Sequence, residues 1–242
     1  LGALVLTLRW WGEYGFATAA WQGVFHAVSA FNNAGFSLFS TNLIGSRGDV
    51  IVNLTICLLI ISGGIGYLVL TELSRYRKDH LISLHSRLAL TMTLVLIVGG
   101  TLAIFLLERG NAASLGSLPH GEAWLAAFFQ SVTTRTAGFN TVDIGALRPA
   151  TLFLMIILMF IGAAPGGTGG GVKVSTFGVT VLALLAWLRH VGLPRERVLI
   201  YAWHPLPMWE FSGMAHIDGA AIALLMLAIL AVERQRQGLA GG

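Results

Sequence analysis

Residues 50–73 form a long apolar run whose only charged residue is Glu72. An α-helix needs roughly 20 consecutive apolar residues to cross a bilayer, and this run is long enough. The whole chain has the same character, since 55% of its 242 residues are hydrophobic and only 11% are charged, against about 25% in soluble domains. A soluble globular domain is therefore excluded, and we expect an all-α membrane protein.

Three further apolar segments extend this reading. Residues 88–107 predict a second span, and residues 150–187 a third that is broken at 162–171, where seven of ten residues are Gly or Pro. The short stretch Leu1–Leu8 is interpreted as the tail of an earlier span, so that the chain reads as a fragment. The single cysteine, Cys57, lies inside an apolar run and excludes a disulfide scaffold; we expect it to pack between helices.

The basic residues predict the orientation in the membrane. Arginines and lysines cluster at 75–87 and again at 189–197, and such loops usually face the cytoplasm. The loop at 108–121 then lies outside, and the segment 122–140 has to enter and leave the membrane by the same face. Irregular backbone at membrane depth is tolerated only where it lines water or protein. We therefore expect the segment 122–140 to be a re-entrant pore loop in a plasma-membrane protein with several spans.

An internal repeat supports this interpretation. The motif Ala-Trp-x3-Phe-x8-Ala-Gly-Phe-polar occurs twice, 103 residues apart, each time before a long apolar span. The identical pairs are Ala20 and Ala123, Trp21 and Trp124, Phe25 and Phe128, Ala34 and Ala137, Gly35 and Gly138, and Phe36 and Phe139. Six identities at one offset favour a true repeat over chance agreement in an apolar chain. Repeats of span, re-entrant loop and span are typical of channels and transporters.

The two glycines suggest how such loops would hold a cation. Backbone carbonyls can replace the water shell of K⁺, and turning them toward one axis needs backbone angles that a Cβ obstructs. Short helices at about 18–32 and 122–135 would direct their partly negative C-terminal ends at the ion. The alternative is that Gly35 and Gly138 merely allow close helix packing. The repeated pair with polar flanks favours the filter, with Phe36 and Phe139 expected to wedge each loop against neighbouring helices.

The residues at 29–37, SAFNNAGFS, and at 133–141, TTRTAGFNT, resemble the second and third pore loops of the Trk/Ktr/HKT superfamily of potassium transporters. The resemblance implies four span–loop–span units around one pore, of which two are present here. It also implies a homodimer, a cytosolic nucleotide-binding ring as partner and no cofactor. The filter residues it implies, with K⁺ held by the backbone of Gly35 and Gly138, are Asn33, Ala34, Gly35, Phe36, Thr136, Ala137, Gly138 and Phe139.

The glycine-rich break resembles the interrupted helix that follows the third loop in that family. A phosphate-binding loop is excluded, because Val172 separates Gly171 from Lys173 and no Ser or Thr follows the lysine. The resemblance implies a gate below the filter, in a loop that we expect to be flexible, whose Lys173 could contact carbonyls or an acidic partner. The gate residues are Gly166, Gly167, Thr168, Gly169, Gly170, Gly171 and Lys173.

The predicted organisation is therefore a second pore unit over 1–74 and a third over 86–187. The second unit holds a pore loop at 18–40 and a span at 50–74. The third holds the span 88–107, a pore loop at 122–141 and the broken span 150–187. His26, at the membrane end of the first pore helix, is interpreted as a structural hydrogen-bonding residue.

Residues 188–242 are interpreted as a divergent tail with a short helix at 219–232. Part of it, around YAWHPLPMWEF at 201–211, is similar to a segment of polyprenol-linked membrane mannosyltransferases, which suggests a composite chain joined near 188–194. Glu210, His216 and Asp218 either bind a metal or sugar phosphate, or cap an interfacial helix, the reading we favour. Potassium transport without catalysis is the leading function; a fragment of a polyprenol-phosphate-sugar-dependent glycosyltransferase is the alternative.

Overall fold

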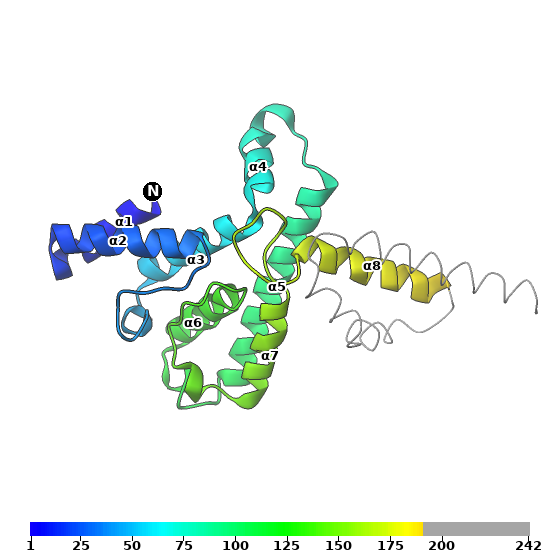
Figure 1. Cartoon of the computed structure of the whole chain (residues 1–242). Coiled ribbons are helices and arrows are strands. Elements are labelled where there is room, and N and C mark those ends of the chain that lie inside the picture. The colour runs from blue at the N-terminus through cyan, green and yellow to red at the C-terminus, as the bar shows by residue number, and fades with distance from the viewer. Residues whose placement is uncertain (191–242) are drawn as a thin grey trace, which may run out of the picture. The chain divides into compact units, whose positions relative to one another are not determined.

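The computed structural model describes residues 1–190, without side-chain detail at 77–79, 188 and 190. This part is helical throughout, with no named strand (Figure 1). The helices are α1 (Gly2–Tyr14), α2 (Phe16–Phe31), α3 (Val50–Ile65), α4 (Tyr67–Asp79), α5 (Leu84–Glu108), α6 (His120–Thr133), α7 (Pro149–Phe160) and α8 (Val174–His190). Three 3₁₀ turns, η1 (Ile44–Ser46), η2 (Leu115–Ser117) and η3 (Ile144–Ala146), lie in the connecting loops.

Each repeat begins with a pair of packed helices. Helices α1 and α2 lie side by side, as do α5 and α6, and α7 packs along α5 (Figure 1). The second helix of each pair is short, with 16 residues in α2 and 14 in α6. At 1.5 Å per residue they reach about 24 and 21 Å, less than the roughly 30 Å of hydrocarbon. Their lengths therefore suit helices that enter the membrane and stop inside it.

The predicted span over 50–74 is not one continuous helix, because the chain breaks at Gly66. Helices α3 and α4 meet there at a bend of 102°. Gly66 has a φ of 87°, in the left-handed region, and a Cβ at this position would lie 2.6 Å from the carbonyl oxygen of Pro165. Only glycine fits both the backbone angle and the close approach.

The predicted break in the 150–187 span lies between α7, which ends at Phe160, and α8, which begins at Val174. Residues Leu1–Ser175 form one compact unit, so the two repeats do not separate into independent bodies. From Thr176 onward, α8 belongs to a second unit, in which Thr180 Oγ1 donates a hydrogen bond to the carbonyl of Thr176.

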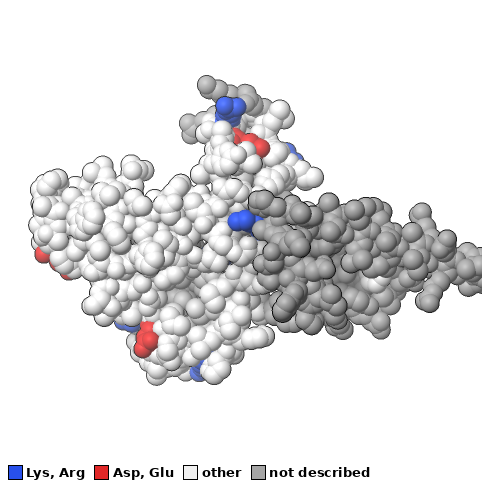
Figure 2. Space-filling view, in the orientation of Figure 1, with Lys and Arg blue, Asp and Glu red and all other residues white. Residues whose placement is uncertain are grey.

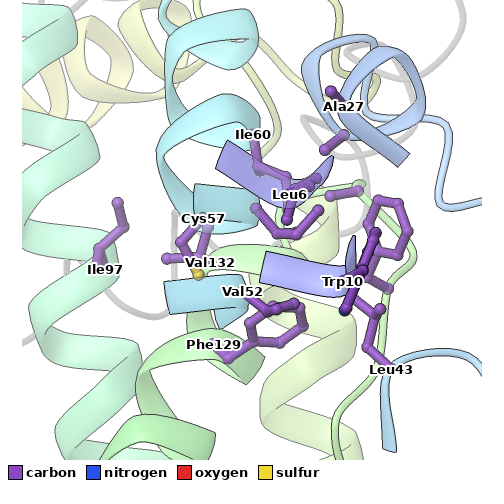
Figure 3. Packing of buried hydrophobic residues seen from close by; sticks show 14 of the residues in the cluster. Leu6, Trp10, Ala27, Leu43, Val52, Cys57, Ile60, Ile97, Phe129 and Val132 are labelled. Atoms are coloured by element: carbon purple, nitrogen blue, oxygen red, sulfur yellow. The ribbon is translucent and has the colours of Figure 1, made fainter. Parts of the chain in front are cut away.

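One hydrophobic core joins the two repeats (Figure 3). It brings together Leu6 and Trp10 of α1, Ile56 and Cys57 of α3, and Phe129 of α6, all at most 2% exposed. Cys57 is a buried packing residue here, as its sequence position suggested. Because helices of both repeats share this core, α2 and α6 are each held against the other repeat as well as their own.

The outer surface of the unit is apolar over long stretches. On α5, six large apolar side chains are more than 45% exposed: Leu84, Leu94, Val95, Val98, Leu102 and Leu106. Charged groups on the face shown in Figure 2 gather mainly at the tip formed by α4 and the start of α5 and along the opposite edge. Among the described helices, α5 is long and apolar enough to cross a membrane, and α3 with α4 passes the same test as a bent pair.

A buried carboxylate connects several segments at the C-terminal end of α5, the end opposite the α4–α5 turn. Glu108, the last residue of α5, is fully buried and accepts hydrogen bonds from four groups. The donors are Asn111 Nδ2 at 2.7 Å, Ser114 Oγ at 2.5 Å, the backbone N–H of Arg148 at 2.8 Å and Thr151 Oγ1. One side chain therefore ties the end of α5 to the turn after it and to the first turn of α7.

We expect Glu108→Ala to lower the free energy of unfolding by at least about 2 kcal/mol, since it leaves several buried donors without an acceptor. Thermal unfolding of the detergent-solubilised protein measures the effect. Glu13→Ala is the matched control, because Glu13 is exposed and its loss is expected to change stability by less than about 0.5 kcal/mol. Equal melting temperatures for the two variants would contradict the assignment.

Candidate functional site

The chain segments that follow α2 and α6 meet at the two repeat glycines. A Cβ on Gly35 would lie 2.7 Å from the Cα of Gly138 and 2.5 Å from the carbonyl oxygen of Ala137. A Cβ on Gly138 would lie 3.2 Å from the Cα of Gly35. The two loops are thus in direct backbone contact at the positions that the repeat singled out, 103 residues apart in the sequence.

The loops also share an unusual backbone conformation. Gly35 and Gly138 have φ values of 72° and 82°. Two residues before each glycine, Asn33 and Thr136 have φ values of 51° and 70°. Left-handed residues are uncommon outside glycine, and a β-branched residue such as Thr136 is an outlier there. Left-handed residues at alternate positions turn successive peptide groups toward one side instead of alternating them as a strand does.

The carbonyl groups of these loops are left free by the fold. No residue in the described part of the chain donates a hydrogen bond to the carbonyl oxygens of residues 33–35 or 136–138. A backbone carbonyl at membrane depth costs several kcal/mol unless water, protein or an ion satisfies it. Ala34 and Gly138 are exposed, so part of this carbonyl set is open to such a partner.

Each loop is anchored to its own pore helix by a hydroxyl group. Ser29 Oγ donates to the carbonyl of Phe36 at 2.8 Å, and Thr133 Oγ1 donates to the carbonyl of Phe139 at 2.7 Å. The backbone N–H of Ala34 donates to the carbonyl of Ser29 at 2.9 Å in the first loop. These bonds hold the carbonyls after each glycine back against the helix, which separates them from the free set.

His26 and the cross-repeat contacts fix the chain beyond the glycines. His26 Nε2 lies 3.0 Å from Ser37 Oγ and accepts from the N–H of Leu38 at 3.3 Å, while Nδ1 lies 2.7 Å from the carbonyl of Gln22. His26 is therefore a buried hydrogen-bonding residue, as interpreted from the sequence. Between repeats, the N–H of Leu43 donates to the carbonyl of Asn140 at 3.1 Å.

The two phenylalanines differ, and the expected wedge is found at one of them. Phe139 is 1% exposed, and its ring lies 6.4 Å from that of His26 on the other repeat's pore helix. Phe36 is 70% exposed, so the prediction that it wedges its loop is wrong for the described residues. The cause is geometric: the second loop faces the first repeat's helix, whereas the described chain provides no corresponding helix beside Phe36.

The glycine-rich break is a closed turn rather than a loose loop. The N–H of Gly162 donates to the carbonyl of Val172 at 3.0 Å, and the N–H of Val172 donates to the carbonyl of Phe160 at 2.9 Å. Inside the turn, the N–H of Ala163 donates to the carbonyl of Gly170 at 3.2 Å. Lys173 Nζ donates to the carbonyl of Gly169 at 3.0 Å, which places this lysine on a carbonyl, one of its two expected partners.

This turn is bonded to the end of α3. The N–H groups of Ala164 and Thr168 donate to the carbonyls of Gly64 and Gly63, at 2.8 and 3.1 Å. The last carbonyls of any helix lack intrahelical partners. Because α4 bends away from α3 at Gly66, the last carbonyls of α3 are free to accept hydrogen bonds from the glycine-rich turn.

The same turn contacts the end of α2 and the loop after α6. Thr168 Oγ1 donates to the carbonyl of Phe31, the last residue of α2, at 2.9 Å, and the N–H of Gly170 donates to Thr136 Oγ1 at 3.0 Å. A Cβ on Gly169 would lie 2.8 Å from both Asn33 Nδ2 and Thr136 Oγ1. The predicted filter and gate residues are therefore adjacent in space.

The sequence analysis assigned no role to Arg135. The structure places this residue between the end of α6 and the glycine-rich turn. Its side chain is 7% exposed, and Nη2 donates to the carbonyl of Gly162 at 3.0 Å and lies 3.5 Å from Thr93 Oγ1. Arg135 links the end of α6 to the start of the glycine-rich turn. The available signal was an ionisable residue at membrane depth, which is a functional candidate by default. The predicted helix 219–232 and Glu210, His216 and Asp218 lie outside the described residues.

A family described as TrkH, cation transport protein, matches residues 11–224. The chain belongs to this family. The TrkH family is a transport family and not an enzyme family, and its members are membrane proteins, which agrees with the helical architecture. The fold likewise resembles the crystal structure of the potassium transporter TrkH from Vibrio parahaemolyticus, with a TM-score of 0.61 and 19% identity over 82% of this chain and 40% of that one.

The chain is also similar in sequence to curated potassium uptake proteins. The Ktr system potassium uptake protein B of Vibrio alginolyticus is 44% identical over 97% of this chain and 51% of its own length. The protein of the same name from Bacillus subtilis is 44% identical over 78% of this chain and 42% of its own length. The chain thus spans about half the length of the curated relatives it matches.

These comparisons do not support the composite-chain interpretation of residues 188–242. The family match continues to residue 224, and the similarity to the Vibrio alginolyticus protein covers 97% of the chain. The glycosyltransferase alternative rested on the same segment and is likewise unsupported. The apolar, aromatic composition of that segment is shared by many membrane proteins, so a short resemblance there was a weak guide.

We expect Gly35→Ala to destabilise the fold by about 1–3 kcal/mol or more, because a Cβ would meet backbone atoms of the second loop at a left-handed position. The control is Gly45→Ala, since a Cβ on Gly45 meets no atom within 4 Å. Thermal unfolding and the folded yield after solubilisation compare the two. Equal stability of both variants would show that the loops do not touch as described.

Proposed function

We propose that this chain forms part of a potassium pathway in which the loops after α2 and α6 supply the selectivity filter. The observation that carries the proposal is the contact of Gly35 with Gly138 beside a set of carbonyl oxygens that accept no hydrogen bond within the described chain. Free carbonyls suit a dehydrated alkali cation, since they replace its water ligands. The filter residues are Asn33–Phe36 and Thr136–Phe139.

The electrostatics of the site support a cation. Both pore helices end at the loops, so the partly negative C-terminal ends of α2 and α6 lie next to the free carbonyls. A membrane potential contributes about 2.3 kcal/mol per charge for each 100 mV, which is enough to drive uptake without a catalytic group. The Nη2 group of Arg135 donates its hydrogen bond to the carbonyl of Gly162.

The pathway needs more carbonyls than two loops provide. The curated relatives are about twice as long as this chain, and a ring of four such units would complete the coordination. We propose that the complete subunit, meaning this chain within a sequence of its relatives' length, has that arrangement. It would form a homodimer in the plasma membrane, with loops 75–87 and 189–197 in the cytoplasm and a cytosolic nucleotide-binding ring as regulatory partner.

Potassium uptake by the complete subunit tests the filter. We expect the unmodified subunit to restore growth at low potassium in a transport-deficient bacterium, and Gly138→Ser to reduce the preference for K⁺ over Na⁺ by about tenfold. A side chain at a left-handed filter position is strained, and relief of that strain shifts the neighbouring carbonyls. A loss of about 1–2 kcal/mol in the coordination of K⁺ relative to Na⁺ corresponds to roughly that factor. Rubidium uptake in competition with sodium measures the preference. Sodium matters because the Potassium/sodium uptake protein NtpJ of Enterococcus hirae is 36% identical over 78% of this chain.

Gly121→Ser is the matched control, since a Cβ on Gly121 meets no atom within 4 Å and the residue lies at the far end of α6. It should leave both uptake and preference unchanged. Unchanged preference in Gly138→Ser as well would overturn the filter assignment.

We further propose that the glycine-rich turn, residues 162–173, obstructs the pathway below the filter, with Gly166, Gly167, Thr168, Gly169, Gly170, Gly171 and Lys173 as the gate. Its contacts with Phe31 and Thr136 support this position. Lys173 would oppose the passage of cations, because its charge lies within the same turn.

Deleting residues 169–171 in the complete subunit should raise the maximal rate of rubidium uptake, since the shortened turn can no longer reach both pore loops. Expression is matched by immunoblot. A rate that stays at the unmodified level would argue against a gate at this position.

A further inference from the structure

Thr136 occupies a position that its side chain disfavours. It has a φ of 70°, and branching at Cβ makes this region less accessible to threonine than to almost any other residue. Asn33, at the equivalent position of the first loop, has a φ of 51°, and asparagine tolerates this conformation. Such strain persists where the surroundings fix the residue, and it concentrates at functional positions.

The hydroxyl group of Thr136 explains why a threonine stands at this left-handed position. Oγ1 accepts a hydrogen bond from the N–H of Gly170 at 3.0 Å, so the strained filter residue holds the glycine-rich turn. On the other repeat the direction is reversed, because Thr168 of the turn donates through Oγ1 to the carbonyl of Phe31 at 2.9 Å. Two residues of the turn, Thr168 and Gly170, are thus bonded to the end of α2 and to the loop after α6.

We propose that Thr136 and Thr168 form a latch that couples the position of the glycine-rich turn to the backbone of the filter. The proposal rests on the filter and gate assignments above. With the turn in place, the bond from Gly170 holds Thr136 in the left-handed region, and with it the direction of the neighbouring carbonyls. When the turn leaves, Thr136 loses that bond and can relax toward ordinary backbone angles, which rotates those carbonyls.

Coupling of this kind is reciprocal. If the latched turn stabilises the filter geometry that binds K⁺, bound K⁺ stabilises the latched turn by the same free energy. The latch therefore makes a second prediction beyond flux: potassium itself should slow the release of the turn, and it should do so only while the latch is intact. Thr136 and Thr168 act here as positioning residues, since neither side chain needs to touch the ion.

A cysteine at position 170 reports the release directly. A Cβ on Gly170 meets no atom within 4 Å, so Gly170→Cys fits sterically, and the buried Cys57 is removed by Cys57→Ala. The rate of labelling by a membrane-permeant maleimide is measured for the complete subunit in membrane vesicles, in potassium and in choline. The variants compared are Thr136→Val, Thr136→Ser, Thr168→Val and Thr101→Val.

We expect Thr136→Val to label about three- to tenfold faster than the unmodified latch in potassium, which is the effect of losing one hydrogen bond. Valine keeps the shape and the backbone strain of threonine, so the hydroxyl is the only loss. Thr136→Ser should restore slow labelling. Thr168→Val should also label faster, and this variant tests the latch if Thr136→Val fails to fold. Thr101→Val is the matched control, because within the described residues the Thr101 hydroxyl donates to the carbonyl of Ile97 in its own helix and to no other group.

The role of potassium separates the latch from the proposed function. Slower labelling of the unmodified latch in potassium than in choline, with this difference lost in Thr136→Val, supports the coupling. If potassium slows labelling equally in both, the filter stands and the latch is overturned. If Thr136→Val labels faster but potassium has no effect on either, the turn is held by Thr136 but the potassium filter is contradicted. Equal labelling of Thr136→Val, Thr168→Val and Thr101→Val also overturns the latch.

Discussion

Backbone amides and carbonyls inside a membrane need partners, because hydrocarbon supplies none. This requirement explains the arrangement around the two pore loops. Helices α2 and α6 are too short to cross a bilayer, and α3 ends at Gly66. The glycine-rich turn gives its own N–H groups to the carbonyls of Gly63 and Gly64, and the hydroxyl of Thr168 to that of Phe31. Within the described residues, the carbonyls of residues 33–35 and 136–138 accept no hydrogen bond, and the proposed ion pathway would give them a partner.

The resulting site is built from peptide groups rather than from charged side chains. Ser29 and Thr133 hold back the carbonyls of Phe36 and Phe139, which leaves those of residues 33–35 and 136–138 to face elsewhere. The side chains near the filter act as supports: His26 fixes the first loop, and Arg135 links the second to the glycine-rich turn. One turn touches both loops, so the proposed filter and the proposed gate are in direct contact.

The sequence predicted those parts of the site that its repeat and its apolar runs encode. The 103-residue offset placed both pore helices within a few residues and paired Gly35 with Gly138. Hydropathy could not show the bend at Gly66, since Gly63, Gly64 and Gly66 lie inside an apolar run that reads as one span; three glycines in four residues were the signal. Nor could it show that Thr136 is left-handed or that Phe36 is exposed, because both depend on contacts between distant segments. The similarity of residues 201–211 to membrane mannosyltransferases was misleading for a different reason: aromatic, apolar composition carries little information about descent.

In the proposed pathway, the free carbonyls at Gly35 and Gly138 face one path for an alkali ion. Crystals of the complete subunit grown in rubidium, with data collected at the rubidium absorption edge, measure this directly. The account predicts an anomalous peak within coordination distance of the carbonyl oxygens of both loops, on the side opposite to the hydroxyls of Ser29 and Thr133. Rubidium sites that lie elsewhere, with these carbonyls facing lipid or other protein groups, would contradict it.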